Sequence, residues 1–417
     1  IGNLATSYEE YRDQLEVFKK ISLERESLVV IASGNEGPGL GTAYNVGESE
    51  SVITVGAYMS EALWTINYNT VVPGETLWFY SGVGPQLNGT LAPSVVAPSA
   101  VISTVNRWDS GGYFAMDGTS MAAPFVSGSA ALILQRARIS DLDIDVWNLK
   151  KCIETGARKI EGFDDFEQGY GLIDVKNTWE QLKKRAFSLD KIGIKTPLID
   201  GYTQGAFSRD HLRSEQELSL INLSDTLQEI ILESKSPWIS IEKEELLLPR
   251  GKPQELILSY KIPEIPGVYS GKILGNAKNE RTNSFEFITT VVVPYDLEKT
   301  SALDFNNSLQ PSRWHRYYFK TVPGMSNLKI KLNVLKRDIG HRGPGLLYVY
   351  DPDGIKVFEG YAGEDYISPL SCTVFDSSKP KAGIWEVVVV SDYNLSHFGI
   401  SKTEYKLSIA VSGMFTH

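Results

Sequence analysis

One serine in this sequence stands where its hydroxyl could act as a nucleophile. Ser120 follows a turn that contains Gly118, and it lies in the first turn of a predicted helix of small and apolar residues. A helix N-terminus presents free backbone N–H groups and a positive dipole end, which favour developing negative charge. Gly118 has no side chain, so a substrate backbone could pass close by. On this pattern alone, Ser120 is either a nucleophile or a capping serine in front of a core helix.

The segment around Ser120 resembles the nucleophile segment of the subtilisin-like serine proteases, the subtilase family. The residues that carry the resemblance are GTSMAAPFVSG at 118–128. The resemblance implies that Ser120 is the catalytic nucleophile, and that Gly118 and Thr119 belong to the substrate-binding site.

A second segment, from Val29 to Gly39, agrees with the first. It has the pattern of a short buried strand that runs into a loop rich in Gly and Pro. It resembles the subtilase strand whose asparagine completes the oxyanion hole. The resemblance implies that Asn35 donates its side-chain amide to the oxyanion, alongside the N–H of Ser120. Without the resemblance, an asparagine in such a loop is a turn former.

The resemblance also implies which residues contact the substrate, a protein or peptide. Ala32, Ser33 and Gly34 would line the primary specificity pocket, where small residues leave room for a large apolar side chain. Ile1 and Gly2 would be the last residues of a strand that pairs with the substrate backbone.

A serine protease of this type needs a histidine base and an aspartate that orients it. Asp109-Ser110-Gly111 has a suitable composition, but its polar surroundings favour a hairpin turn. All five histidines follow Ser120 and none lies in a His-Gly-Thr context; they are His211, His315, His341, His397 and His417. We therefore expect the chain to be the C-terminal part of a protease, with His and Asp supplied by an upstream segment of the same protease.

The elements that would position these residues fall into three predicted domains. Residues 1–185 are predicted to form the C-terminal part of an α/β subtilisin-like catalytic domain, with a parallel sheet flanked by helices. Small or apolar residues from Val126 to Leu134 predict a serine helix buried on every side. Alternating runs broken by Pro, Gly and Asn predict a β-sandwich at 186–298 and a β jelly-roll-like domain at 299–417.

Composition limits the partners and the compartment. The formal net charge of −10 argues against nucleic acid or an anionic membrane as the main partner, and no apolar run is long enough for a membrane span. The two cysteines rule out a disulfide framework and a cysteine-based metal site. No metal ligands can be assigned, and the resemblance alone would suggest calcium. Four glycosylation sequons favour an extracellular or cell-surface protein over a cytoplasmic one; they begin at Asn88, Asn222, Asn306 and Asn394.

Two activities and one inactive role remain open. The first is a serine endopeptidase that works through an acyl-enzyme on Ser120, with Asn35 in the oxyanion hole. The second is a tripeptidyl exopeptidase. Residues 55–58, the insert at 59–77 and the two β-domains resemble the tripeptidyl-peptidase II and pyrolysin branch of the family. This resemblance implies a cytoplasmic protein that forms homo-oligomers. The third is a non-catalytic fragment or binding module that keeps the fold without turnover.

Overall fold

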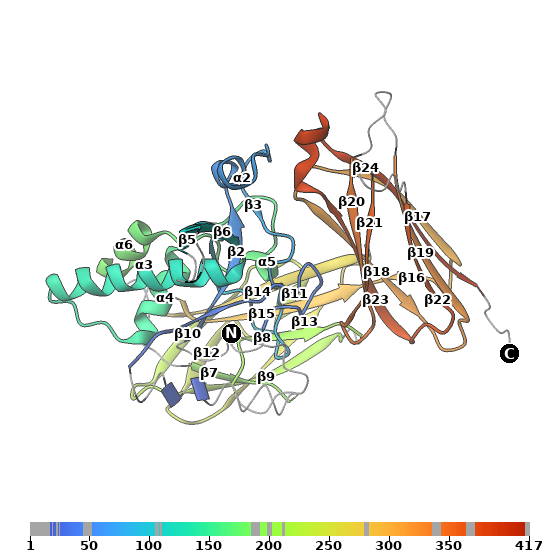
Figure 1. The fold of residues 1–417 in the computed structure, drawn as a ribbon. Helices are drawn as coiled ribbons and strands as arrows, with labels where there is room; N and C mark the ends of the chain where they lie inside the picture. Colours follow the sequence, from blue (N-terminus) through green and yellow to red (C-terminus); the bar gives the residue numbers. More distant parts are fainter. Residues whose placement is uncertain are drawn as a thin grey trace.

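Three parts follow one another along the chain, an α/β part and two regions whose described elements are strands and one short helix (Figure 1). The structure is a computed structural model, and it describes residues 17–18, 20–21, 24, 26–44, 52–104, 108, 111–184, 192–197, 202–210, 213–278, 283–335, 343–363 and 372–412.

A small parallel sheet forms the centre of the α/β part. Its strands are β1 (Val29–Ala32), β2 (Val52–Met59) and β4 (Val95–Pro98), and β2 pairs in parallel with both of the others. The short strand β3 (Thr76–Leu77) pairs antiparallel with the end of β2. All eight residues of β2 are buried, as expected of a parallel strand whose two faces are both covered.

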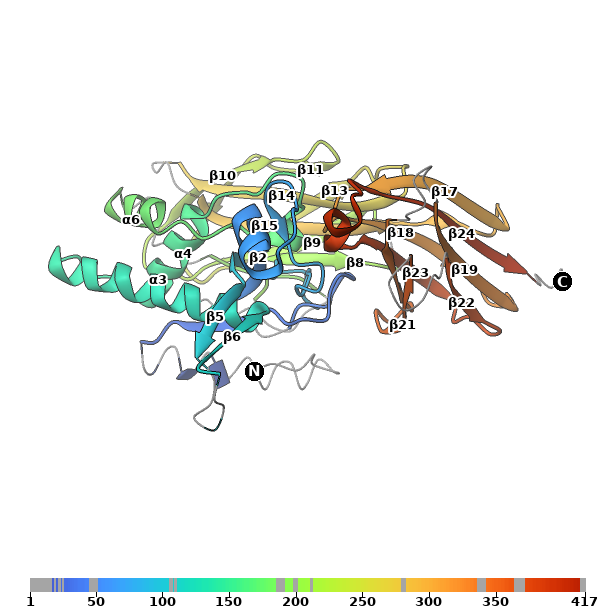
Figure 2. The ribbon, with the colours of Figure 1, turned by 45° about the horizontal axis from the view of Figure 1, so that its top comes forward.

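Helices pack on this sheet and carry the serine. α3 (Thr119–Ile139) contacts β1, β2 and β4, and its buried side chains share one apolar core with the sheet. α4 (Val146–Gly156) and α6 (Val175–Lys184) complete this core. Figure 2 shows the three helices together at one end of the molecule. The short helix α5 (Asp165–Gln168) lies between α4 and α6 in the chain.

The prediction that the serine helix is buried on every side is wrong for the described chain. Phe125, Leu132 and Ile139 of α3 are 46%, 60% and 69% exposed. Burial all round requires a second layer on the far side of the helix. None of the described elements supplies that layer, and β1, which α3 contacts, pairs only with β2 among the described strands.

A hairpin leads into the serine helix. Its strands β5 (Ala100–Thr104) and β6 (Tyr113–Asp117) pair antiparallel, with Thr104 opposite Tyr113. The turn predicted at Asp109-Ser110-Gly111 falls in the connection between them. Asp109 and Ser110 lie outside the described residues.

The second part packs two sheets on one apolar core, which makes it a β-sandwich. The strand orders are β12–β10–β14–β15–β8 and β11–β13–β9–β7. Leu218 and Leu256 from one sheet meet Ile230 and Phe287 from the other. The strands are β7 (Ile192–Lys195), β8 (Gly205–Ser208), β9 (Glu215–Asn222), β10 (Gln228–Ser234), β11 (Ile239–Ile241), β12 (Glu245–Leu248), β13 (Gln254–Tyr260), β14 (Gly267–Ala277) and β15 (Asn283–Val293).

The third part is a second β-sandwich. Its sheets have the orders β16–β18–β23–β20–β21 and β17–β24–β19–β22, and they enclose a core that includes Trp385, Leu347 and Tyr405. The short helix η1 (Tyr393–Phe398) connects β23 to β24. The strands are β16 (Tyr295–Asp296), β17 (Ala302–Leu309), β18 (Trp314–Thr321), β19 (Asn327–Val334), β20 (Gly345–Tyr350), β21 (Lys356–Ala362), β22 (Cys372–Ser377), β23 (Gly383–Ser391) and β24 (Thr403–Ser412).

Alternating burial along these strands is the physical origin of the sequence pattern. In β9, for example, every second residue from Gln216 onward is buried, as one face of each sheet meets the core and the other meets solvent. The jelly-roll topology for 299–417 and the domain boundaries at 185 and 298 stay predictions.

One small core joins the three parts. Leu40 and Phe166 of the α/β part pack with Ile288 of the first sandwich and with Tyr318 and Ile384 of the second. All five are buried, and Leu40 and Tyr318 are each 1% exposed. The loop that contains Leu40 begins at the end of β1, so this shared core ties that loop to both sandwiches.

Two of the four predicted glycosylation sites are buried. Asn222 is 0% exposed, and its side-chain amide donates to the carbonyl oxygens of Thr226 (2.7 Å) and Leu248 (2.8 Å). Asn88 is 1% exposed. A glycan needs an asparagine at the surface, so the argument for an extracellular or cell-surface protein now depends on the sequons at Asn306 and Asn394.

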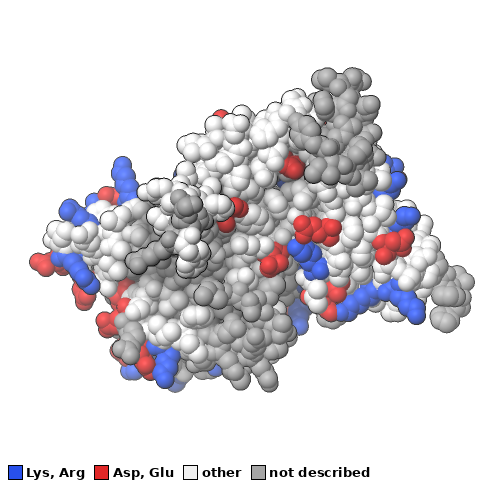
Figure 3. Space-filling view, viewed as in Figure 1, with Lys and Arg blue, Asp and Glu red and all other residues white. Residues whose placement is uncertain are grey.

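The described surface carries charges of both signs. At the end of the molecule where α3 and α6 lie, basic and acidic side chains are interspersed (Figure 3). Within the described ranges, no helix combines the length and the apolarity that crossing a membrane requires.

The insert helix α2 (Glu61–Tyr68) offers a test of how the α/β part and the second sandwich pack. Trp64 of α2 is 0% exposed and stacks on Tyr393 of η1 at 5.0 Å between ring centroids. The aromatic cluster around α2 consists of Trp64 and the rings packed on it, Tyr68, Trp78 and Tyr393. We expect Trp64→Ala to lower the unfolding free energy by about 3–5 kcal/mol, because it leaves a large cavity in this cluster. Urea unfolding followed by circular dichroism measures the change. The control is Ile66→Ala on the same helix, where the side chain is 72% exposed; equal midpoints for the two variants would contradict the packing described.

Candidate active site

Ser120 is the second residue of α3, at the point where the β5–β6 hairpin enters the helix. The turn is anchored because the N–H of Gly118 donates to the carbonyl oxygen of Ser99 at 3.0 Å. Gly118 and Thr119 are buried, whereas Ser120 is exposed. As the second residue of a helix, Ser120 has an N–H with no acceptor inside the helix. A rigid turn therefore holds one hydroxyl and one N–H donor at the surface.

Gly118 allows an unusual backbone at this turn. Its φ of 136° is one that residues with a side chain rarely adopt. A Cβ built on Gly118 would lie 3.3 Å from Nδ2 of Asn35 and 3.8 Å from the backbone N of Ser120. Both nitrogens therefore border the same small space, which the missing side chain leaves open.

Asn35 is fixed by two hydrogen bonds from the serine turn. Its Oδ1 accepts the backbone N–H of Thr119 at 3.1 Å and the Thr119 hydroxyl at 2.9 Å. Because donors must face the oxygen, the Nδ2 end points the other way, toward the space beside Gly118. Thr119 itself is 0% exposed, so its role here is to orient the amide of Asn35.

The strand end before Asn35 is closely packed. Ser33 donates its N–H to Val55 at 2.9 Å, and Gly82 donates its N–H to Gly34 at 2.8 Å. A Cβ on Gly34, whose φ is 97°, would lie 2.8 Å from the ring of Tyr44. Ala32, Ser33 and Gly34 are all buried. Their predicted contact with substrate stays a prediction.

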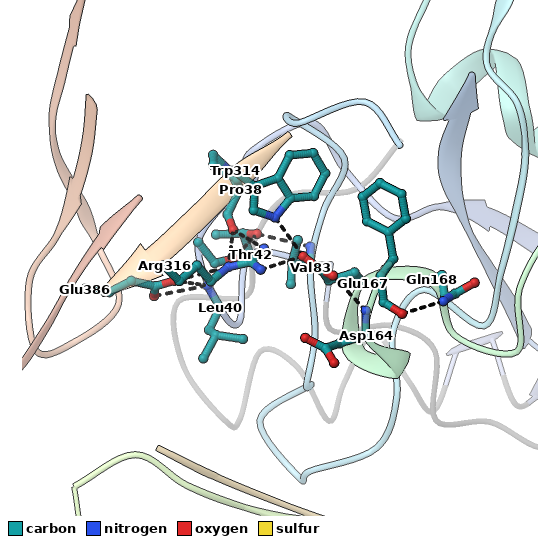
Figure 4. A network of polar contacts seen from close by, with 12 residues as sticks. Pro38, Leu40, Thr42, Val83, Asp164, Glu167, Gln168, Trp314, Arg316 and Glu386 are labelled. Carbon is teal, nitrogen blue, oxygen red and sulfur yellow. Dashed lines mark hydrogen bonds and ion pairs between the residues drawn. The ribbon is translucent and has the colours of Figure 1, made fainter. Parts of the chain in front are cut away.

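The loop after Asn35 is bound by the second sandwich at three consecutive residues. The guanidinium of Arg316 donates to the carbonyl oxygen of Pro38 at 2.7 and 3.1 Å. The Tyr350 hydroxyl accepts the N–H of Gly39 at 3.0 Å. Both carboxylate oxygens of Glu386 accept the N–H of Leu40 at 3.1 Å. Figure 4 shows how Arg316 and Glu386 reach this loop from their strands.

The charges in this network are deeply buried. Glu386 is 0% exposed; it lies 3.6 Å from Nε of Arg316 and 3.5 Å from Arg209 of the first sandwich. Burial raises the pKa of the Glu386 carboxyl, and the two arginines act in the opposite direction. Burial lowers the pKa of the Arg316 guanidinium, but the carboxylates of Glu167 and Glu386 outweigh it and raise that pKa. Arg316 also bonds to Glu167, which accepts the indole N–H of Trp314 at 2.7 Å.

A hydrogen bond from Tyr80 also holds the serine turn. The Tyr80 hydroxyl donates to the carboxylate of Asp117, which immediately precedes Gly118. Burial, followed by the nearby Asp117 carboxylate, raises the pKa of Tyr80 well above its ordinary value. Tyr80 also stacks on Trp78 at 4.9 Å, so the turn that carries Ser120 is in contact with the aromatic cluster around α2.

The structure places Ser120, Thr119, Gly118 and Asn35 close together. Gly2 and three of the histidines, His211, His341 and His417, lie outside the described residues. The two described histidines belong to the second sandwich. His315 bonds through Nδ1 to the Tyr405 hydroxyl at 2.7 Å, and His397 bonds through Nε2 to the Asn69 carbonyl oxygen at 2.8 Å.

Sequence analysis missed the residues that hold the loop, Arg316, Tyr350 and Glu386. One signal was available for Glu386, because it is a single carboxylate inside the apolar run of β23. A cavity of about 250 Å³ lies where α5 meets the two sandwiches, lined by residues such as Asp164, Val268 and Arg313. Within the described residues, no cluster of His, Cys, Asp or Glu suited to a metal ion occurs.

Substitution of Gly118 tests the geometry around Ser120. We expect Gly118→Ala to slow labelling of Ser120 by a fluorophosphonate by about tenfold or more, because the new methyl group would displace the amide of Asn35. Labelling is followed by mass spectrometry. The control is Gly112→Ala in the same hairpin, where φ is also positive (72°) but a Cβ meets nothing within 4 Å. Equal labelling rates in the two variants would contradict this geometry.

Comparison with known proteins agrees with these observations. A model of the subtilase family of peptidases matches residues 2–171. Pyrolysin of Pyrococcus furiosus is 28% identical over 402 aligned residues, which cover 86% of this chain and 27% of pyrolysin. Tripeptidyl-peptidase 2 of Drosophila melanogaster is 31% identical over 168 residues, or 39% of this chain and 12% of the relative.

The fold is shared with a solved structure of a tripeptidyl peptidase 2. A crystal structure of tripeptidyl peptidase 2 matches 95% of this chain and 33% of that chain with a TM-score of 0.72, at 18% sequence identity. This chain thus spans about a quarter of the length of pyrolysin and a third of that solved chain. The resemblance seen in the sequence is confirmed: residues 2–171 match the subtilase family, and relatives named as proteases align with this chain.

Proposed function

We propose that this chain forms the C-terminal part of a peptidase in which Ser120 is the nucleophile and Asn35 completes the oxyanion hole. The observation that carries the proposal is the space beside Gly118, which Nδ2 of Asn35 and the N–H of Ser120 both border. Donors that are already in place where negative charge develops lower the barrier of acyl transfer without further rearrangement. The hydrogen bonds from Thr119 to Asn35 keep one of these donors in place.

In this mechanism the Oγ of Ser120 attacks the carbonyl carbon of the peptide bond, and its proton passes to a histidine base. The carbonyl oxygen becomes the oxyanion and accepts hydrogen bonds from Asn35 and Ser120. The C–N bond then breaks, and the amine leaves with the proton from the histidine. Water hydrolyses the acyl-enzyme on Ser120 by the same steps and regenerates the hydroxyl.

The base and the orienting aspartate come, in this proposal, from an upstream segment of the same protease. His315 bonds to Tyr405 within the second sandwich, and His397 bonds to Asn69 at the end of α2. Phe125, Leu132 and Ile139 are exposed on α3, and this face runs from near the N-terminal turn that carries Ser120 to the end of the helix. A segment that covers this face and pairs with the edge of β1 that no described strand occupies would bring its side chains near Ser120.

Ala32, Ser33 and Gly34 complete the proposal on the substrate side. Ala32 ends β1, Ser33 and Gly34 follow it and lead to Asn35, and none of the three carries a bulky side chain. We propose that they border the subsite that receives the side chain preceding the cleaved bond. Protein and peptide substrates with large apolar residues at that position fit this arrangement.

Covalent labelling tests the nucleophile directly. We expect a fluorophosphonate to add to Ser120 of the protease that contains this chain together with its upstream segment, because only an activated serine reacts with this class of probe. Intact mass followed by peptide mapping locates the adduct. Ser120→Ala abolishes it, whereas Ser127→Ala, which removes another exposed hydroxyl of α3, leaves it intact. Unlabelled wild-type protease would favour a non-catalytic module.

A tripeptidyl exopeptidase is the second candidate, because relatives named tripeptidyl-peptidase 2 match both the sequence and the fold. The two modes differ in their need for a free substrate N-terminus. For an endopeptidase we expect peptides with free and acetylated N-termini to be cleaved at similar rates. Mass spectrometry of the products decides, since release of tripeptides from free N-termini alone would replace the endopeptidase with the exopeptidase.

A further inference from the structure

We infer that the second β-sandwich positions the oxyanion hole, through Tyr350, Glu386 and Arg316. These residues follow Asn35 by more than 280 positions in the sequence, yet they bind the loop that begins at Asn35. The inference rests on the proposed function of Asn35. It makes these three side chains positioning residues, since they act on the reaction through the backbone of the loop.

The contacts are consecutive and include both donors and acceptors of the loop backbone. Arg316 binds the carbonyl oxygen of Pro38, Tyr350 binds the N–H of Gly39 and Glu386 binds the N–H of Leu40. Two consecutive peptide groups, Pro38–Gly39 through both its C=O and its N–H and Gly39–Leu40 through its N–H, are therefore fixed by one sandwich. The N–H of Gly37 is held from the other side by the carbonyl oxygen of Tyr80 at 2.9 Å.

Steric fit at Gly39 gives a second, independent observation. A Cβ on Gly39 would lie 2.5 Å from the Tyr350 ring. The phenol thus lies flat against the backbone of the loop, at a distance that only glycine permits. Tyr350 is 1% exposed, and the neighbouring Leu40 side chain lies in the core that the three parts of the molecule share. The loop has little freedom to move without displacing the sandwich.

Directional bonds of this kind matter more for geometry than for stability. A buried ion pair such as Arg316–Glu386 contributes no more to stability, on average, than well-packed apolar side chains would. The hydrogen bonds that Arg316 and Glu386 make to the loop, however, are short-ranged and angular, so they fix where the loop backbone lies. Asn35 is three residues before Pro38, and among the described residues its Oδ1 is bound by Thr119 alone. The position of its Nδ2 therefore depends on where the sandwich holds the loop.

Tyr350→Phe is the sharpest test, since it removes one hydroxyl and leaves the ring and the charged network in place. The control is Tyr348→Phe on the same strand, where the hydroxyl is directed to Glu359 and not to the loop. Both are made in the protease that contains the upstream segment, alone and combined with Asn35→Ala. We measure kcat and KM on a peptide substrate and amide hydrogen exchange of residues 36–41.

We expect Tyr350→Phe to lower kcat by about tenfold with KM unchanged, because a misplaced donor weakens binding of the transition state alone. Exchange at 36–41 becomes faster, and Tyr348→Phe changes neither quantity. In the Asn35→Ala background, Tyr350→Phe lowers kcat no further, since the amide that it positions is already absent.

Two results overturn the inference while the proposed function stands. One is an active wild type in which Tyr350→Phe changes neither kcat nor exchange. The other is an equal loss of kcat with and without the Asn35 amide, which would show that Tyr350 acts only on general stability. An inactive wild type that also fails to label at Ser120 overturns the proposed function and this inference with it. Exchange at 36–41 then still reports whether Tyr350 holds the loop.

Discussion

The buried ion pair between Arg316 and Glu386 of the second sandwich connects to the other two parts of the chain through Glu167 and Arg209. Removing one partner of such a pair costs about 3–5 kcal/mol, because the remaining charge stays buried without compensation. Here the compensation comes from every part of the chain. Glu167 belongs to the α/β part, and Arg209 follows β8 of the first sandwich. The charges are therefore satisfied only when all three parts are in place.

Elements of the second sandwich contact the loop after Asn35 directly and the serine turn through aromatic side chains of the α/β part. The loop after Asn35 rests on strands β18, β20 and β23. The serine turn is reached through η1, whose Tyr393 stacks on Trp64 of α2, and through Tyr80, which binds Asp117. The direct bonds from Thr119 to Asn35 then fix the two supports relative to each other. The spacing between nucleophile and amide is thus set by packing as much as by the local turn.

Much of this arrangement could be predicted from local sequence. The glycine and the helix start at 118–120, the strand before Asn35 and the alternating strands after residue 191 all follow from patterns within a few residues. The sequence could not show that α3 keeps an exposed apolar face, since residue type alone does not reveal whether a second layer covers a helix. It also could not show that Glu386 reaches Leu40, because that contact joins positions 346 residues apart. The sequons at Asn88 and Asn222 wrongly predicted surface sites for a related reason, because a three-residue motif carries no information on burial.

The shared core around Leu40 has a consequence for how this family of proteins can change in evolution. Domains that meet only through linkers can be exchanged, duplicated or lost as modules. Here Tyr318 and Ile384 complete the packing of Leu40, and Ile288 of the first sandwich lies in the same cluster. A recombination event that brought in a foreign sandwich would leave this core unfilled and the Glu386 network incomplete. Gene rearrangements that persist should therefore carry the segment from Asn35 to Glu386 as one inherited unit.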